Sequence, residues 1–539
     1  MDARSAGLGA VAGVLAAGAA LGVGQFAAGL TGASGSPVVV VGELQIDFTP
    51  PWLKNFAISQ FGADDKLVLI SGIVVVLGAF AALVGAAATR RMAYGMAGVA
   101  VFAAVGLTAA ATRPDATVTS LLPTLAATAS AVAVLHLLIP MVRPQALPPT
   151  ARAVSYDPVT GPADPGTTPA ETEEPGLAAA EGSGGPQRRS FLAAGAATAG
   201  IAAGAGLAGR LLTERSSVAR AQKSLRIPQP AITTQALPPG VDLHIPGLSS
   251  FITPNGKFYR VDTALVLPQV DPSSWQLRIH GMVNREITLT FDQLIKRPLI
   301  EDYITLCCVS NPVDGPYIGN AKWLGASLAA LLKEAGIKAG ADQLLCTSVD
   351  GFTSGTPVQT VMDGRDALLA VAMNGQPLPI AHGFPARMVV PGLYGYVSAT
   401  KWVTDIEVTT FAGNYAYWAQ RGWSQRAPIK TECRIDVPNG LREITAGRTA
   451  VAGVAWAQHK GIEAVEVRVD RGPWQEARLA EVPGLDTWRQ WVWEWDATTG
   501  GHVLEARATD KTGYTQTSAL APPEPNGAAG YPMVSVPVR

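Results

Sequence analysis

Two short segments of the chain carry the side chains best suited to chemistry. Residues 304–311 form an apolar run that contains two adjacent thiols, Cys307 and Cys308. Residues 382–392 form a turn-rich loop with one histidine and one arginine, followed by a short apolar stretch. A thiolate suits a soft metal centre better than oxygen ligands do, and a nearby metal or cation stabilises the thiolate form.

On the residues alone, other interpretations of these thiols stay open. Free cysteine is most often a small buried hydrophobic side chain. A nucleophilic cysteine would need a histidine base, and His382 is the only good candidate for that role. The two segments must therefore be considered together.

Together they resemble the cofactor site of the sulfite-oxidase family of molybdopterin enzymes. In that family a strand of the form Thr-Leu-x-Cys-x-x-Asn supplies one thiolate to molybdenum, and a His-Gly-Phe-Pro-x-Arg loop holds the pterin. Cys308 is the matching cysteine, because it follows Leu306 by two positions and precedes Asn311 by three. Cys307 would point to the opposite face of the strand, so we expect it to be structural.

The resemblance implies a role for each of six residues. Cys308 is the expected metal ligand and catalytic residue, and Arg260, which follows an aromatic pair, is expected to reach the active site. The expected cofactor-binding residues are Asn311, as a donor that orients the ligand strand, and His382, Arg387 and Lys401 on the pterin and its phosphate. For Arg260 the alternative is a surface arginine on a strand. For Lys401 it is a solvated strand lysine, because the chain has one more residue before Lys401 than the family's Ser-x-Lys-Trp.

The implied reaction is a two-electron oxygen-atom transfer to or from a small substrate at a molybdenum-molybdopterin centre. Two departures leave the substrate open. The family has an active-site tyrosine before its Met-Asn-Gly run, where this chain has Val371, and basic residues after Cys-x-x-Asn, where it has Pro-Val-Asp-Gly at 312–315. An anionic substrate needs cationic groups, so sulfite-like and sulfoxide-like substrates both fit. Tyr317 or Tyr394 could supply a hydroxyl.

Composition favours a membrane protein of several domains. The chain has 539 residues, of which 15% are charged, and a mean hydropathy of +0.21. The net charge of −1 gives no sign of a nucleic-acid partner. Four cysteines are too few for a disulfide scaffold, although a Cys346–Cys433 bridge stays open.

Residues 1–143 contain four apolar stretches long enough to be transmembrane helices, at 7–30, 67–88, 92–111 and 118–142. Arginines flank these stretches on one side, at positions 4, 90, 91 and 143. Under the positive-inside rule, that side is cytoplasmic.

Residues 144–187 are rich in Pro, Gly, Thr and Glu and are predicted to form a disordered cytoplasmic linker. Residues 188–212 combine Arg-Arg-Ser-Phe-Leu with an Ala/Gly-rich stretch, which resembles a twin-arginine export signal leading into a fifth transmembrane helix. The alternative is a pair of ordinary positive-inside arginines. Both interpretations predict a multi-pass protein of the bacterial cell membrane whose soluble domains are extracytoplasmic.

Two soluble domains follow. Residues 225–425 are expected to form an α+β molybdopterin-binding domain, with a strand at 275–281 and a helix at 324–332 that Gly336 closes. Residues 426–539 alternate with period two at Val465–Val469 and Trp491–Trp495, which predicts an immunoglobulin-like β-sandwich. This part resembles the family's dimerisation domain and implies a homodimer.

Electron transfer requires a redox partner, and a cytochrome or a quinone-linked protein is expected. A haem within the chain is not expected, because His136 is the only histidine in any predicted span. The rival interpretation is a non-enzymatic, membrane-anchored surface protein that binds a partner through its β-sandwich.

Overall fold

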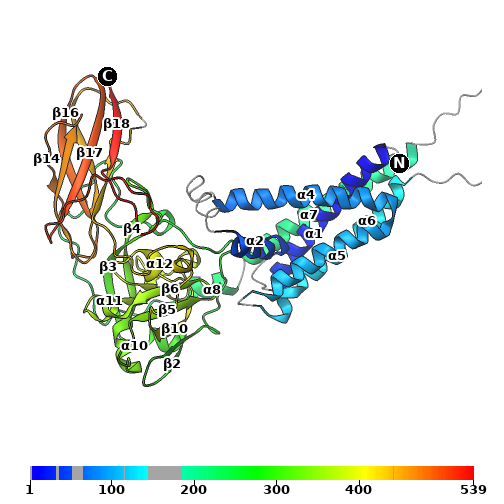
Figure 1. The fold of residues 1–539 in the computed structure, drawn as a ribbon, viewed down its shortest axis with the longest axis horizontal. Helices are drawn as coiled ribbons and strands as arrows, with labels where there is room; N and C mark the ends of the chain where they lie inside the picture. Colours follow the sequence, from blue (N-terminus) through cyan, green and yellow to red (C-terminus); the bar gives the residue numbers. More distant parts are fainter. Residues whose placement is uncertain are drawn as a thin grey trace, which may run out of the picture. The chain divides into compact units, whose positions relative to one another are not determined.

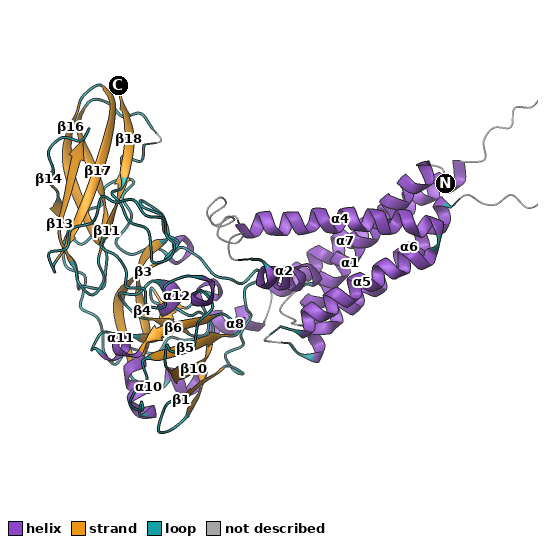
Figure 2. Ribbon diagram, viewed as in Figure 1, coloured by secondary structure: helices purple, strands orange, loops and turns teal. Residues whose placement is uncertain are grey.

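The computed structural model describes residues 3–31, 36–50, 65–113, 116–143, 185–214, 217–440 and 442–539 (Figure 1). They form two compact units. The first comprises Met1–Gly42, Leu67–Ala111 and Val118–Thr213, and the second comprises Glu43–Lys66, Thr112–Thr117 and Glu214–Arg539. The first unit is helical, and the strands of the described chain all lie in the second (Figure 2).

The first unit is built from long apolar helices. They are α1 (Ala3–Thr31), α4 (Asp65–Arg90), α5 (Met92–Ala111), η2 (Val118–Leu121), α6 (Leu122–Val142) and α7 (Gly185–Glu214), while α2 (Pro37–Phe48) has residues in both units. Five described helical stretches are long and apolar enough to cross a membrane, and each predicted span overlaps one of them. Large apolar side chains face outward, including Val75 at 70% and Leu83 at 68% exposure. An outward apolar surface of this kind suits contact with lipid.

Glycines let these helices approach closely. A Cβ atom on Gly13 of α1 would overlap the carbonyl oxygen of Ala81 in α4, and one on Gly22 would overlap that of Ala202 in α7. Small residues at helix crossings are typical of helices that pack in lipid, where close backbone contact replaces hydrophobic burial.

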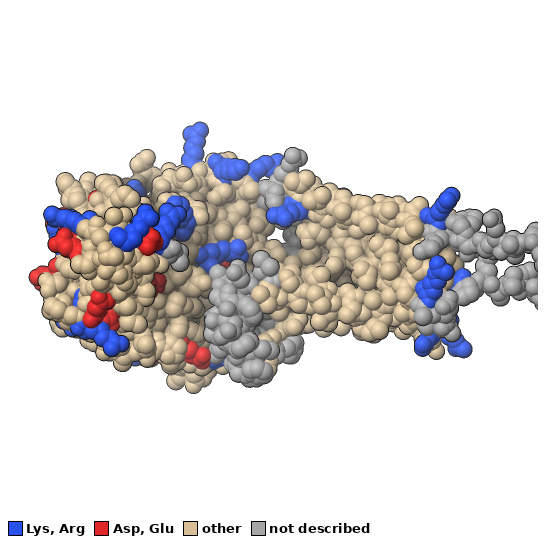
Figure 3. All heavy atoms as spheres, turned by 90° about the horizontal axis from the view of Figure 1, so that it is seen from above, with Lys and Arg blue, Asp and Glu red and all other residues tan. Residues whose placement is uncertain are grey.

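Positive side chains gather at one end of the helical unit (Figure 3). Arg143, directly after α6, donates from Nη2 to the carbonyl oxygen of Ala88, near the end of α4, at 2.7 Å. The turn between α4 and α5 holds Arg90 and Arg91. The predicted linker, residues 144–187, lies outside the described residues except for its last three, which are helical and begin α7.

The strands of the second unit form four sheets, of which the first two lie in residues 276–409. The first sheet runs in the order β2-β1-β10-β5-β6, and the second in the order β3-β4-β7-β8 with β9 beside β7. The first sheet's strands are β1 (Gln276–Gly281), β2 (Ile287–Thr290), β5 (Gln343–Ser348), β6 (Thr353–Pro357) and β10 (Val403–Thr409). The second sheet's strands are β3 (Leu299–Cys307), β4 (Ile318–Ser327), β7 (Leu368–Met373), β8 (Gln376–Pro377) and β9 (Arg387–Val389).

Short helices connect these strands. They are α8 (Ser217–Ser224), η3 (Asn255–Lys257), α9 (Phe291–Ile295), α10 (Leu328–Ala335), α11 (Val358–Met362), η4 (Ile380–His382), α12 (Gly395–Ser398) and η5 (Ala419–Arg421). The sheets and helices share one large apolar core. A β-rich domain with short helices agrees with the expected α+β class.

The predicted helix at 324–332 is wrong in its first half. Leu324 lies in β4 and pairs with Glu301 of β3 and Ala372 of β7. The helix begins only at Leu328, because the hydroxyl of Ser327 accepts from the backbone N–H of Ala330 and caps it. β4 is buried on both faces, so its sequence lacks the alternation that marks a half-buried strand.

The last part of the chain contains two four-stranded sheets, β11-β12-β16-β15 and β14-β13-β17-β18. The strands are β11 (Glu432–Val437), β12 (Gly447–Trp456), β13 (Ile462–Val469), β14 (Gln475–Glu476), β15 (Arg478–Leu479), β16 (Arg489–Ala497), β17 (Gly500–Asp510) and β18 (Met533–Val538). Val465, Val467, Trp491 and Trp495 lie in their common core, as the alternation predicts. The immunoglobulin-like assignment stays a prediction.

The loop between β15 and β16 is hydrogen-bonded directly to the strand that leads to Cys308. The backbone N–H of Thr305 in β3 donates to the carbonyl of Asp486 at 2.9 Å, and the Thr305 hydroxyl accepts from the N–H of Trp488 at 2.8 Å. The indole N–H of Trp488 reaches the carbonyl of Phe251 at 2.9 Å. The C-terminal part of the chain therefore holds β3 through this loop.

The glycine contacts of the helical unit give a first prediction. Gly13→Val should destabilise the unit by about 1–3 kcal/mol, because α1 and α4 would have to separate. Thermal unfolding of the detergent-solubilised chain, followed by its helical circular dichroism, measures this. Gly78→Val is the control, since a Cβ there meets nothing within 4 Å. Equal unfolding temperatures for the two variants would contradict the close crossing.

Candidate functional site

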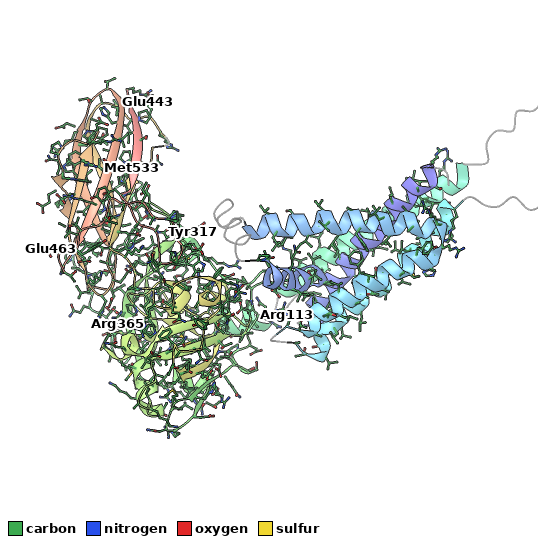
Figure 4. The ribbon with its side chains drawn as sticks, in the orientation of Figure 1. Arg113, Tyr317, Arg365, Glu443, Glu463 and Met533 are labelled. Atoms are coloured by element: carbon green, nitrogen blue, oxygen red, sulfur yellow. The ribbon has the colours of Figure 1, made fainter. Side chains whose placement is uncertain are left out.

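Cys308 stands at the end of strand β3, at the start of a closed loop. Its backbone N–H donates to the carbonyl of Tyr317 at 2.9 Å, and its own carbonyl accepts from the N–H of Asn311 at 3.0 Å. The Asn311 side-chain carbonyl accepts from the N–H of Tyr317 at 2.7 Å. Tyr317 directly precedes β4 and is labelled in Figure 4. Asn311 thus fixes the loop behind Cys308. Its buried Nδ2 has no hydrogen-bond partner among the described residues.

The two thiols have different surroundings. Cys307 is fully buried in the apolar core, whereas Cys308 keeps 9% exposure. Burial raises the pKa of the Cys308 thiol, while hydrogen bonds from Ser310 and the positive charge of Lys401 oppose that rise. A thiol of this kind becomes a thiolate when a metal binds it. All four cysteines are free, so the Cys346–Cys433 bridge is not formed.

Gly383 allows the histidine loop to lie against the chain that carries Arg387 and Lys401. Its φ of +110° is left-handed, and a Cβ there would lie 2.9 Å from the Arg387 Cβ and 3.2 Å from the Lys401 Cα. Arg387 and Lys401 are themselves paired as an isolated β-bridge. Only glycine fits this position without strain. Gly383 therefore allows the histidine loop to pack directly against the paired backbone of Arg387 and Lys401.

His382 is a buried, neutral histidine. Its Nε2 lies 3.3 Å from the carbonyl of Asn255, to which a neutral ring donates. Its ring meets Phe258 edge to face at 5.6 Å. Burial, together with the positive charges of Arg387 and Lys401, lowers the pKa of His382 to about 4. At neutral pH the ring can therefore offer one donor and one acceptor but no charge.

Arg387 is a buried cation whose acceptors are backbone carbonyls. Its guanidinium donates to His382 at 3.1 Å, to Ala399 at 3.1 Å and to Met388 at 3.3 Å, and it lies 5.1 Å from the ring of Trp323. Burial lowers its pKa to about 10, which leaves it charged at neutral pH.

Lys401 and Arg260 share one carboxylate, Asp262. Lys401 Nζ lies 2.6 Å from Asp262 Oδ2, and Arg260 Nε lies 2.8 Å from the same oxygen. The Lys401 side chain is 10% exposed and the Asp262 side chain 5%. Burial lowers the pKa of Lys401 to about 8, and the Asp262 carboxylate opposes this shift. Lys401 is therefore not the solvated strand lysine of the alternative interpretation.

The structure brings four of the predicted residues together around the histidine loop, and they are His382, Arg387, Lys401 and Arg260. Arg387, Lys401 and Arg260 all act electrostatically on His382, and Lys401 also acts on the Cys308 thiol. Asn311 lies in the Cys308 loop. Two cations are buried here, and this concentration of positive charge beside a soft thiol fits an anionic, phosphate-bearing cofactor whose metal takes one thiolate.

Sequence reasoning missed Asp262 and Tyr259. Burial raises the pKa of the Tyr259 phenol, and so does the charge of Cys308, which places that hydroxyl in the electrostatic field of the thiol. Tyr394, one of the two tyrosines expected to supply a hydroxyl, is 2% exposed and packed in the core. The only signal in the sequence was that both missed residues lie within two positions of Arg260.

Comparison with known proteins gives a consistent result. The family model "Oxidoreductase molybdopterin binding domain" matches residues 264–418. Mitochondrial sulfite oxidase of Rattus norvegicus is 28% identical over 322 residues, which cover 51% of this chain and 58% of that protein. The uncharacterized oxidoreductase YuiH of Bacillus subtilis is 30% identical over 156 residues, which cover 29% of this chain and 75% of that protein. The chain thus matches less than two thirds of the length of the sulfite oxidase.

Among solved structures, the sulfane dehydrogenase SoxCD from Paracoccus pantotrophus matches with a TM-score of 0.45 and 25% identity. The match covers 50% of this chain and 75% of that one.

The low pKa of His382 predicts a specific pH dependence. Its usual pKa of 6.5 applies to the unfolded chain, so between pH 6.5 and about 4 the unfolded state binds the extra proton. Stability should therefore fall as the pH falls through this window, by on the order of 3 kcal/mol from this group. His382→Gln should remove that part of the loss in urea unfolding compared at about pH 7 and about pH 4.5.

His244→Gln is the matched control, because the side chain of His244 is 87% exposed. If both variants lose the same stability on acidification as the parent, the buried neutral histidine is contradicted.

Proposed function

The chain belongs to the sulfite-oxidase family of molybdopterin-dependent oxidoreductases, and from that premise we propose that it transfers an oxygen atom to or from a small substrate in a two-electron reaction. The family match implies a molybdenum-molybdopterin cofactor. The observation that carries the proposal for this chain is the buried group of Arg387, Lys401 and neutral His382 beside the Cys308 loop.

Each site residue has a proposed task. Cys308 is the protein's thiolate ligand to the metal, and Asn311 holds the loop that aims it. Arg387 and Lys401 bind the pterin and its phosphate, for which a guanidinium fork and an ammonium are suited. When bound, the cofactor supplies the two-electron redox chemistry. His382 donates or accepts a hydrogen bond without adding charge, and Arg260 and Tyr259 would face the substrate.

Metal content tests the assignment. In a host that makes the cofactor, the full chain should contain about one molybdenum, set by a single thiolate site, and Cys308→Ser should lose most of it. Elemental analysis of the purified protein measures this. Cys346→Ser is the control, because Cys346 is a fully buried thiol in another sheet and should leave the metal content unchanged.

A well-folded parent without molybdenum would defeat the enzyme proposal. The alternative, a membrane-anchored binding protein that acts through its C-terminal sheets, would then take its place. Retention of the metal by Cys308→Ser would instead remove Cys308 from the ligand role.

We also propose a membrane arrangement. Residues 1–143 hold four transmembrane helices, 188–212 hold a fifth preceded by a twin-arginine-like signal, and residues 225–425 and 426–539 are two extracytoplasmic domains. The exposed apolar side chains of the helical unit and the arginines at one of its ends support this proposal. The immunoglobulin-like second domain would mediate a homodimer.

The export signal can be separated from ordinary charge bias. Replacing Arg188 and Arg189 together by lysine keeps the charge, so under the positive-inside rule the topology should not change. If the pair is an export signal, the second unit should instead remain inside, where protease added to spheroplasts cannot cleave it. The same double replacement at Arg90 and Arg91 is the control and should leave cleavage unaffected.

The reaction needs an electron partner outside the described sites. We propose a cytochrome or a quinone-linked protein, since the predicted spans contain one histidine, His136, and a bis-histidine haem needs two. The five helices would then anchor the enzyme where such partners reside.

A further inference from the structure

Asp262 pairs with Arg260, the site cation that could meet a substrate, and with Lys401, which is proposed to bind the cofactor. Its Oδ2 accepts from Lys401 Nζ at 2.6 Å and from Arg260 Nε at 2.8 Å, and its Oδ1 accepts from Arg260 Nη2 at 3.3 Å. The Arg260 side chain is 38% exposed, whereas that of Asp262 is 5% exposed. Arg260 is therefore the solvent-facing member of the group, and the carboxylate lies behind it.

The surroundings add negative charge. The carboxylate of Asp350 acts on both Asp262 and Lys401 and is itself mostly buried, which raises its pKa. The Cys308 loop from residue 309 to residue 317 contains no lysine or arginine but does contain Asp314. The third site cation, Arg387, already donates to three backbone carbonyls.

A small oxyanion entering this site would have to displace Asp262. Recognition of an oxyanion depends on a fork of N–H donors with positive charge. Here Arg260 Nε and Nη2 and the Lys401 ammonium donate to Asp262, whose negative charge offsets theirs. Displacement would leave a buried carboxylate without its partners, which is strongly unfavourable. Without displacement, the oxyanion and the carboxylate would repel each other.

We propose that Asp262 is a specificity-determining residue which holds the Arg260–Lys401 pair, so that the enzyme accepts an uncharged oxygen-atom donor or acceptor and rejects small oxyanions. This rests on the proposed oxygen-atom transfer and names its substrate class. With a sulfoxide as donor, two electrons and two protons convert it to the sulfide and water. The S–O bond breaks and sulfur is reduced, with a reduced viologen as the artificial electron donor.

The test uses the full chain in detergent, with its molybdenum content measured first. Dimethyl sulfoxide is the uncharged probe, and sulfate, an unreactive dianion, is the charged one. Asp262→Asn should bind sulfate about tenfold to a hundredfold more tightly than the parent, because hydrogen bonds to charged groups become available. Sulfate binding is read as inhibition of viologen oxidation and, independently of activity, as a rise in unfolding temperature.

Two further variants separate charge from structure. Asp262→Glu keeps the carboxylate and should stay as insensitive to sulfate as the parent. Asp363→Asn removes a carboxylate that pairs with Arg365 at 2.6 Å and should also match the parent. Arg365 itself donates to the carbonyl of Pro391, away from Asp262.

The outcomes decide between the proposals. Equal sulfate binding by the parent and a metal-loaded Asp262→Asn overturns the specificity role, as does saturation of the parent by micromolar sulfite with ferricyanide as acceptor. If Asp262→Asn does not fold, sulfate stabilisation of the parent itself would overturn the role, and its absence in both the parent and Asp262→Glu supports it. A parent without molybdenum defeats the proposed function, while the unfolding-temperature comparison still tests the ion pair.

Discussion

Burial of positive charge is the constraint on which this site depends. A guanidinium and an ammonium on paired backbone positions, Arg387 and Lys401, are removed from water, and each such burial costs several kcal/mol unless acceptors replace the water. The fold supplies backbone carbonyls for Arg387 and a carboxylate for Lys401. The left-handed turn at Gly383 brings these acceptors and the two cations within reach of one another.

The Cys308 side of the site depends on a different kind of support. Cys308 follows a strand that is paired with β4 on one side of the sheet, and its loop is closed by Asn311. Thr305, three positions earlier, is hydrogen-bonded to the loop between β15 and β16, and Arg434 of β11 donates to the carbonyl of Gly315 at 2.9 Å. The C-terminal part of the chain therefore fixes the ligand strand as well as forming a domain of its own.

Sequence reasoning could propose only those site residues that lie in contiguous runs. The thiol, the histidine loop and Lys401 each belong to a short motif, and five long apolar stretches identify the helices. Asp262 was missed because its partner Lys401 is 139 positions away, and no local pattern indicates which distant cation a carboxylate will meet. Leu324 was misassigned because strand β4 is buried on both faces. Its sequence therefore lacks the alternation of apolar and polar residues that identifies a half-buried strand.

Two separate features of the chain reduce the positive charge that the site presents. The loop after Cys308 supplies no basic residue, and its one acid, Asp314, is held by the backbone N–H of Ile435 at 3.0 Å. On the other side of the site, Asp262 engages the cations that remain. A loop without positive charge would still leave Arg260 and Lys401 able to attract an oxyanion, and Asp262 alone would not offset further basic residues. Only the combination gives a site that, on the proposed function, would hold its cofactor by positive charge yet present little of that charge to a substrate.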